Sequence, residues 1–340
     1  MTATTRNRRA IGRAQAGLSL IELMIAMLIG LLVVGAAVGI FLSNRQVYRA
    51  TEGVGRMQEG TRVAFELMSR DLREAAANPC VNNLPIANVL IGAGSNWWSN
   101  INSWADAFQG YASATAATGL ATGSGSGQRV ADTEVVQLFS AADNVVTINS
   151  HDTSGAVFTV NDSGHGMVAG DLALVCNGRQ AAIFQVSSVG GGGTTLSHAA
   201  SAGTPGNARA GLNIDGVSNF NYSSSATAGA ESVSILAKLR ITRWYIGNGA
   251  NGPSLYQQVA TANGTVTTQE VAEGVSNLSV LYLVNGQTTY QAAAAVGSNW
   301  SNVTSARITL TLAGTDRVGA GGETIQRQLI HVVSLRNRNP

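Results

Sequence analysis

The N-terminal end of the chain changes abruptly from polar to apolar positions. Residues 1–17 are polar and basic, whereas residues 18–42 are apolar apart from Ser19 and Glu22. The twenty residues 23–42 are apolar without interruption. As a helix they span about 30 Å, the thickness of a bilayer core. An ordinary cleaved signal peptide has an apolar region of only ~7–15 residues, so the pattern predicts a membrane-spanning helix.

Helical periodicity continues beyond this apolar run. Between residues 43 and 77, apolar or small side chains recur at spacings of three and four: Val47, Ala50, Val54, Met57, Thr61, Ala64 and Met68. Glu52 and Glu66 each precede an arginine by four residues, the spacing of ion pairs on an exposed helical face. A proline forces the residue before it out of the α region, so Asn78-Pro79 is expected to end the helix. Residues 18–77 are therefore predicted to form one helix roughly 90 Å long.

Beyond Pro79 the chain is rich in Gly, Ser, Thr, Asn and Ala, with short β-branched runs between turn clusters. Strands are predicted at residues 134–139, 156–160, 172–176, 181–189, 233–246, 278–284, 306–312 and 324–336. No regular helical crossovers separate these runs, which favours an α+β fold with the long N-terminal helix packed on an antiparallel β-rich head. The glycine-rich segments 121–128 and 190–193 are interpreted as flexible connections.

Charge orients the predicted span. Four arginines and no acid precede Gly17, and the positive-inside rule then places the N-terminus in the cytoplasm and the rest of the chain across the membrane. The net charge of +2 includes these arginines, so the part after residue 17 carries −2. Non-specific nucleic-acid binding depends on clustered positive charge, and the sequence therefore disfavours nucleic acid as a partner.

Glu22 is the one charged residue between Ala14 and Leu42, and an isolated carboxylate in hydrocarbon is penalised by several kcal/mol. The stretch G-L-S-L-I-E-L from Gly17 to Leu23 resembles the class III signal of type IV pilins and type II secretion pseudopilins. The resemblance implies that a prepilin peptidase cuts between Gly17 and Leu18 and N-methylates Leu18. Leu18 stands where the family usually has phenylalanine. Glu22 then becomes the fifth residue of the mature chain.

This cleavage would create an ammonium group one helical turn from Glu22, so that neither charge is buried unpaired. The resemblance implies that in a filament Glu22 pairs with the N-terminal amine of a neighbouring subunit and sets the register. The alternative is a chance glutamate that reaches the headgroups from the edge of an anchor. Gly35 and Gly39 form a G-x-x-x-G that permits close helix packing, or else reflect the small-residue composition of the span.

Within the family, residues 62–76 (RVAFELMSRDLREAA) and 332–338 (VVSLRNR) resemble PilW-type minor pilins. The resemblance implies a leader over 1–17, a membrane and filament-core helix over 18–42, its amphipathic continuation over 43–77 and a β-rich head over 78–340. Implied partners are the prepilin peptidase, an inner-membrane assembly platform, the major pilin and other minor pilins, with a tip adhesin as a further candidate. The implied location is the inner membrane, crossed once with a periplasmic head, and later the pilus at the cell surface.

Candidate chemistry is sparse. Cys80 and Cys176 are read as a structural disulfide of an exported domain, or alternatively as two buried free thiols, and they do not make a zinc framework. The four histidines are interpreted as surface or turn residues, and residues 161–171 as a plain loop rather than a calcium site. The aromatic group after the helix is a satellite core or a contact surface: Trp97, Trp98, Trp104, Phe108 and Tyr111.

These observations favour a non-enzymatic minor pilin without cofactor or metal, which takes part in type IV pilus biogenesis through a priming or tip complex. A type II secretion pseudopilin of the J-like kind shares every step and is the nearest alternative. A membrane-anchored periplasmic hydrolase or ligand-binding protein is an alternative of another class, and it would need a convergent polar pocket.

Overall fold

The computed structural model describes residues 17, 19–77, 79, 84–101, 103, 107–142, 144–216, 218–224, 233–313, 324 and 326–338. The predicted leader before residue 17, together with Leu18, Cys80 and Trp104, lies outside these residues. The chain divides into two compact units, residues 1–52 and residues 53–340, and each is described by itself.

One helix, α1 (Leu20–Glu74), begins in the first unit and ends in the second. Its 55 residues give a length of about 80 Å. Ala76 ends the helix with a left-handed φ of 57°, and its backbone N–H donates to the carbonyl of Phe139 at 2.9 Å. The predicted long helix is confirmed, with ends two to three residues inside the predicted ones.

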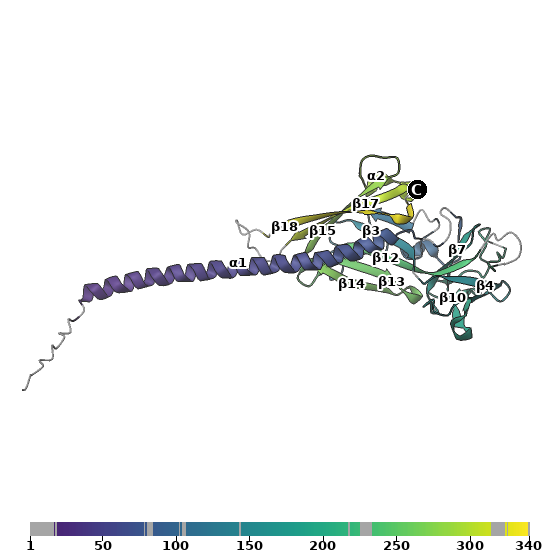
Figure 1. The fold of residues 1–340 in the computed structure, drawn as a ribbon, viewed down its shortest axis with the longest axis horizontal. Helices are drawn as coiled ribbons and strands as arrows, with labels where there is room; N and C mark the ends of the chain where they lie inside the picture. The colour runs from purple at the N-terminus through teal and green to yellow at the C-terminus, as the bar shows by residue number, and fades with distance from the viewer. Residues whose placement is uncertain are drawn as a thin grey trace, which may run out of the picture. The chain divides into compact units, whose positions relative to one another are not determined.

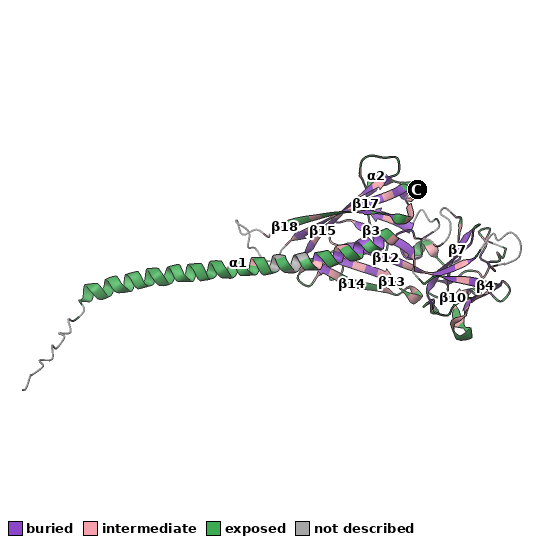
Figure 2. Cartoon of the chain, in the orientation of Figure 1, coloured by how far each residue is buried: buried purple, intermediate pink, exposed green. Residues whose placement is uncertain are grey.

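The part of α1 in the first unit is exposed at every residue except the half-buried Ala50, and Figure 2 shows it as a largely green helix. The most apolar 18-residue window within residues 20–52 has a mean hydropathy of 2.8 and is wholly unburied. By length and composition this helix can cross a membrane.

The head in the second unit contains a large sheet organised by one long strand, β12 (Ile235–Gly249). The first residues of β12 pair with β6 and β4, and its later residues pair with β3 on one side and β13 on the other. The remaining pairs are antiparallel except that of β1 with β7, which is parallel. The other strands of this sheet are β1 (Ile86–Asn88), β2 (Phe108–Tyr111), β3 (Val135–Ala141), β4 (Val146–Asp152), β5 (Val157–Val160), β6 (Leu172–Cys176), β7 (Ala181–Gln185), β8 (Ser188–Gly190), β9 (Thr195–Ser197), β13 (Gly252–Ala260) and β14 (Val266–Glu273).

A second sheet is formed by the C-terminal strands in the order β16-β15-β17-β18, all antiparallel. These are β15 (Val275–Val284), β16 (Gln291–Ala292), β17 (Val303–Ala313) and β18 (Gln326–Ser334), with the short helix α2 (Ala293–Val296) after β16. A small hairpin joins β10 (Ser201–Ala202) to β11 (Gly206–Asn207).

The end of α1 lies between these two sheets, with β15 and β17 on one side and β12 to β14 on the other (Figure 1). Thr61, Ala64, Met68 and Leu72 follow the helical period and are fully buried. Ala64, Met68 and Leu72 enter one core with side chains of both sheets, which include Trp244, Leu255, Ile308 and Leu310. The periodicity found in the sequence therefore marks the buried face from Thr61 onward, whereas Val47 is exposed.

Two glycine-rich segments are ordered by hydrogen bonds rather than free, which corrects the interpretation as flexible connections. In 121–128, the N–H of Gly127 donates to the carbonyl of Asn248 and the Asn248 amide donates to Gly123. In 190–193, β8 leads into a 3-10 turn whose glycines at 191, 192 and 193 adopt positive φ, which glycine adopts without steric cost. Long-range contacts supply the order in the first segment and local turn geometry in the second.

Candidate functional site

The N-terminal motif begins at the exposed Gly17 and leads directly into α1. Ser19 is the residue before the helix, and its Oγ accepts a hydrogen bond from the backbone N–H of Glu22 at 3.2 Å. Its carbonyl accepts the first helical bond from Leu23 at 3.1 Å. Ser19 is thus the N-cap, and Glu22 is the third helical residue. The spacing Ser-x-x-Glu is that of a capping box, a signal in the sequence that our reading of the motif did not use.

This geometry places Glu22 where a negative charge is favoured. Its carboxylate lies in the first turn, where the unsatisfied N–H groups of the helix favour negative charge. Leu18, which is expected to carry the new N-terminal amine after cleavage, lies outside the described residues. The pairing of the amine with Glu22 therefore stays a prediction.

Gly35 and Gly39 lie on an open face of the apolar helix. A Cβ added at either position would meet no atom within 4 Å, and both residues are exposed. The two positions are four apart and therefore adjacent on one face, so another helix could approach the backbone closely there.

Asp71 connects α1 to the large sheet of the head. Its Oδ2 accepts hydrogen bonds from Trp244 Nε1 at 2.9 Å and from Gln257 Nε2 at 2.8 Å, and its Oδ1 lies 2.9 Å from Arg240 Nη2. The carboxylate is nearly fully buried. Burial raises the pKa of Asp71 above its ordinary value, although Arg240 and the two hydrogen bonds oppose the shift.

Cys176 ends β6, is fully buried and is disulfide-bonded. The chain has two cysteines, and the other, Cys80, lies outside the described residues. The pairing of Cys80 with Cys176 therefore stays a prediction.

Three of the four histidines are buried, and the interpretation as surface or turn residues is wrong for two of them, His151 in β4 and His198 after β9. The Nε2 atoms of His151 and His198 lie 2.9 Å apart, in a pocket walled by Phe158, Phe184 and Tyr222. His165 is buried within residues 161–171, and its Nδ1 accepts a hydrogen bond from the backbone N–H of Met167. Only His331 is exposed. The polar atoms of such residues can be satisfied by distant partners, which sequence spacing does not reveal.

The loop 161–171 uses its acids for structure. Asp162 accepts a hydrogen bond from the N–H of Gly164 at 2.8 Å, and the buried Asp171 lies 2.8 Å from Lys238 Nζ. Within the part of the chain that the structure describes, no three His, Cys, Asp or Glu side chains are grouped closely enough to hold a metal ion.

The aromatic residues after the helix contribute to the core. Trp97, Trp98 and Phe108 are buried, and Tyr111 packs at the edge of a smaller apolar cluster. The guanidinium of the buried Arg243 lies 4.0 Å from the centroid of the Trp97 ring. The burial of these aromatic residues supports the satellite core rather than the contact surface.

Comparison with known families matches both ends of this architecture. Residues 12–38, which contain Gly17 and Glu22, match the prokaryotic N-terminal methylation motif. Residues 243–334 match the family described as type IV pilus-assembly protein W. The second match runs from within β12 to the last residue of β18 and so covers strands that enclose the end of α1. Neither a curated protein nor a solved structure matches the chain.

Proposed function

Because the chain belongs to the PilW family of type IV pilus assembly proteins and carries an N-terminal methylation motif, we propose that it is a minor pilin. In this role it joins other minor pilins and the major pilin in a complex that primes or caps the filament. The role is structural, and the proposed chemistry on the chain is limited to its own processing. Prepilin peptidase removes residues 1–17 and methylates Leu18.

The observation that carries the proposal is the contrast along α1. Residues 20–42 are apolar, apart from Glu22, and exposed, whereas the same helix is embedded in the head from Thr61 onward. Exposed large side chains along the first part include Leu20, Leu31 and Phe41, each at least 60% exposed. So much apolar surface is stable only in an apolar phase, either a bilayer or a bundle of like helices. Minor pilins occupy both in turn.

Glu22 is proposed to guide the transfer between these two environments. In the bilayer it would neutralise the new amine of Leu18, and in the filament it would pair with the amine of an adjacent subunit. Buried charge pairs are well attested as devices that fix register rather than as sources of net stability. Gly35 and Gly39 would permit the close helix packing that such a register requires.

The principal test replaces Glu22 with glutamine in the chromosomal copy. The leader should still be removed, so the intact mass and N-terminal sequence should still show methyl-Leu18 as the first residue. The E22Q subunit should remain in the inner membrane fraction and be lost from sheared surface pili. Gly35→Ala serves as a control for altered packing without altered charge. An E22Q subunit that enters pili at the wild-type level would contradict the proposed pairing.

A second experiment separates the pilus from the alternative secretion role. Deletion of the gene should reduce surface piliation, and the full chain should restore it. The type II pseudopilin alternative predicts instead that an exported enzyme accumulates in the periplasm while piliation is unchanged. The match of residues 243–334 to a pilus assembly family favours the first outcome.

A further inference from the structure

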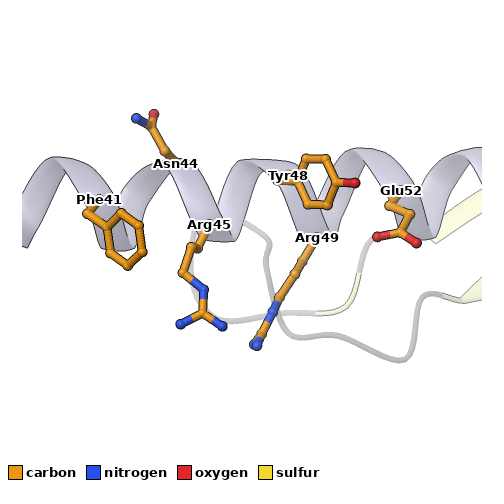
Figure 3. Close-up of a pocket in the computed structure, with 6 residues that line it drawn as sticks. All are labelled: Phe41, Asn44, Arg45, Tyr48, Arg49 and Glu52. Atoms are coloured by element: carbon orange, nitrogen blue, oxygen red, sulfur yellow. The ribbon is translucent and has the colours of Figure 1, made fainter.

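Immediately beyond the apolar run, α1 carries a shallow groove that the proposed function leaves unused. Side chains four residues apart stack into rows along a helix, and two such rows border this groove. Figure 3 shows them: Phe41, Arg45 and Arg49 form one row, and Asn44, Tyr48 and Glu52 form the other. All six residues belong to the first unit of the chain.

The groove is rich in hydrogen-bond donors that could bind an anion. Arg45 and Arg49 supply two guanidinium groups on one face, and Asn44 and Tyr48 add an amide and a hydroxyl. The Arg45 guanidinium lies 5.9 Å from the centroid of the Phe41 ring, which ties the first cation to the apolar end of the groove. Guanidinium groups match the geometry of phosphate oxygens.

The position of the groove selects a phosphate that belongs to a lipid. If residue 42 marks the edge of the hydrocarbon, then Arg45 lies about 5 Å and Arg49 about 10 Å beyond it. The headgroup layer on each side of a bilayer is roughly 5–8 Å thick. Arg45 therefore lies within this layer, and Arg49 lies at its outer edge.

Helix geometry brings both arginines closer to the membrane than their backbone. Side chains on an α-helix tilt toward its N-terminus, which here is the direction of the apolar run. The long stem of Arg49 can therefore extend back into the headgroup layer while its charge stays at the polar boundary. Tyr48, between the two arginines, is of the amphipathic type that gathers at membrane interfaces.

We propose that Arg45, Arg49 and Tyr48 bind the phosphate of an anionic phospholipid headgroup in the leaflet that faces the head domain. The inference rests on the proposed function in one respect, that residues 20–52 are anchored in a membrane before assembly. Arginines on the translocated side oppose the charge bias that orients the chain, and an anionic headgroup would neutralise them locally. The bound headgroup holds the subunit at a fixed depth while it awaits assembly.

The test uses the detergent-solubilised full chain titrated with phosphatidylglycerol or with phosphatidylcholine, and native mass spectrometry counts the bound lipids. The wild type should bind phosphatidylglycerol more tightly. Each basic residue near an anionic surface contributes about fivefold in affinity, so Arg45→Gln with Arg49→Gln should weaken this binding on the order of 30-fold. Binding of phosphatidylcholine should change little.

The matched control is Arg62→Gln with Arg73→Gln, which removes the same charge from two exposed positions of α1 in the second unit. The control should keep the wild-type preference. If both double variants lost affinity for phosphatidylglycerol equally, binding would depend on net charge alone and the inference would be overturned. A wild-type chain that does not prefer phosphatidylglycerol over phosphatidylcholine would overturn it as well. If the Arg45 and Arg49 double variant still preferred phosphatidylglycerol but failed to enter pili, the groove would be assigned to a protein partner instead.

Flotation with vesicles separates this inference from the proposed function. A wild-type chain that does not float with vesicles would contradict membrane anchoring itself. A wild-type chain that floats, in vesicles with or without phosphatidylglycerol, but shows no lipid preference would contradict only the headgroup site.

Discussion

The carboxylate of Asp71 and the indole of Trp244 are hydrogen-bonded at 2.9 Å, although the two residues lie 173 positions apart in the sequence. This bond joins the last turn of α1 to the central strand of the large sheet. Because Gln257 and Arg240 bind the same carboxylate, a single side chain connects the helix to both β12 and β13.

We expect Asp71→Ala to destabilise the head strongly. The substitution leaves the buried Trp244 donor and the half-buried Gln257 donor without an acceptor, and it leaves Arg240 without its close counter-charge. Breaking a fully buried pair of this kind lowers the unfolding free energy by about 3–5 kcal/mol. The loss expected here is smaller, because Arg240 is 36% exposed and solvent screens its charge. The measurement is urea unfolding of the full chain in detergent, followed by tryptophan fluorescence. Glu66→Ala, on an exposed face of the same helix, should stay within about 0.5 kcal/mol of wild type. Similar midpoints for the two variants would refute the assigned role.

Acid should destabilise the head through the histidine pair. Burial lowers the pKa of His151 to about 4 and that of His198 to about 3, with the neighbouring histidine adding to the second shift. His151 Nδ1 accepts the backbone N–H of Tyr222, so the His151 proton lies on Nε2 and is donated to His198.

The direction of this change in stability with pH follows from proton uptake by the unfolded chain. The unfolded chain protonates both rings near pH 6.5, whereas the folded head keeps them neutral to about pH 4. The unfolded state therefore binds more protons between these values, and stability falls as the pH falls, on the order of several kcal/mol in all. Unfolding free energies should be compared between pH 7.5 and pH 4.5 (roughly the two ends of this window) for wild type and for His151→Gln with His198→Gln. An equally steep pH dependence in the double variant would exclude the pair as its source.

The disulfide can be tested by thiol counting and by stability. The unreduced chain should take up no alkylating reagent after denaturation, and the reduced chain should take up two equivalents, one for each cysteine. Cys176→Ser should lower the unfolding free energy by about 2–5 kcal/mol, because the cross-link constrains a long loop in the unfolded chain. A free thiol at Cys80 in the unreduced wild type would disprove the predicted pairing.

Ser19→Ala should fray the start of α1 without affecting the head. Loss of an N-cap side chain costs about 1 kcal/mol, which corresponds to about fivefold faster amide exchange in the first turn. Hydrogen exchange of a peptide covering residues 19–28 in micelles measures this directly. Ser19→Asp should restore protection, because aspartate is an equally good cap. Unchanged exchange in the alanine variant would show that the hydroxyl contributes nothing to capping.

Local pattern was sufficient for much of the architecture. The apolar run and the spacing of Thr61, Ala64 and Met68 predicted α1 and its buried face, since both depend on a period carried by neighbouring residues. The runs at 172–176 and 306–312 predicted β6 and β17 for the same reason. β13 was missed because glutamines at 257 and 258 interrupt its apolar pattern, and Gln257 is retained there for its bond to Asp71.

Order that depends on distant residues could not be predicted. The loop around residues 112–133 is held by the buried Arg129, whose guanidinium donates to the carbonyls of Thr115, Ala112 and Ser113. Glycine and serine content alone indicates flexibility in this segment and does not reveal such an arginine. The burial of His151 and His198 was hidden likewise, because the two Nε2 atoms that pair belong to residues 47 positions apart. The cap by Ser19 was missed although it is local, because the Ser-x-x-Glu spacing that indicates it was not considered.

The placement of α1 between two sheets has a consequence for synthesis. The apolar face of residues 61–72 is among the first parts of the head to be made, yet it is covered by β15 and β17, which are among the last. Until roughly the final hundred residues have emerged, the cover that β15 and β17 provide is missing, and folding must wait for contacts of high sequence separation, which form slowly. A newly made chain therefore passes through a period in which a chaperone, or rapid completion of translation, decides whether it folds or aggregates.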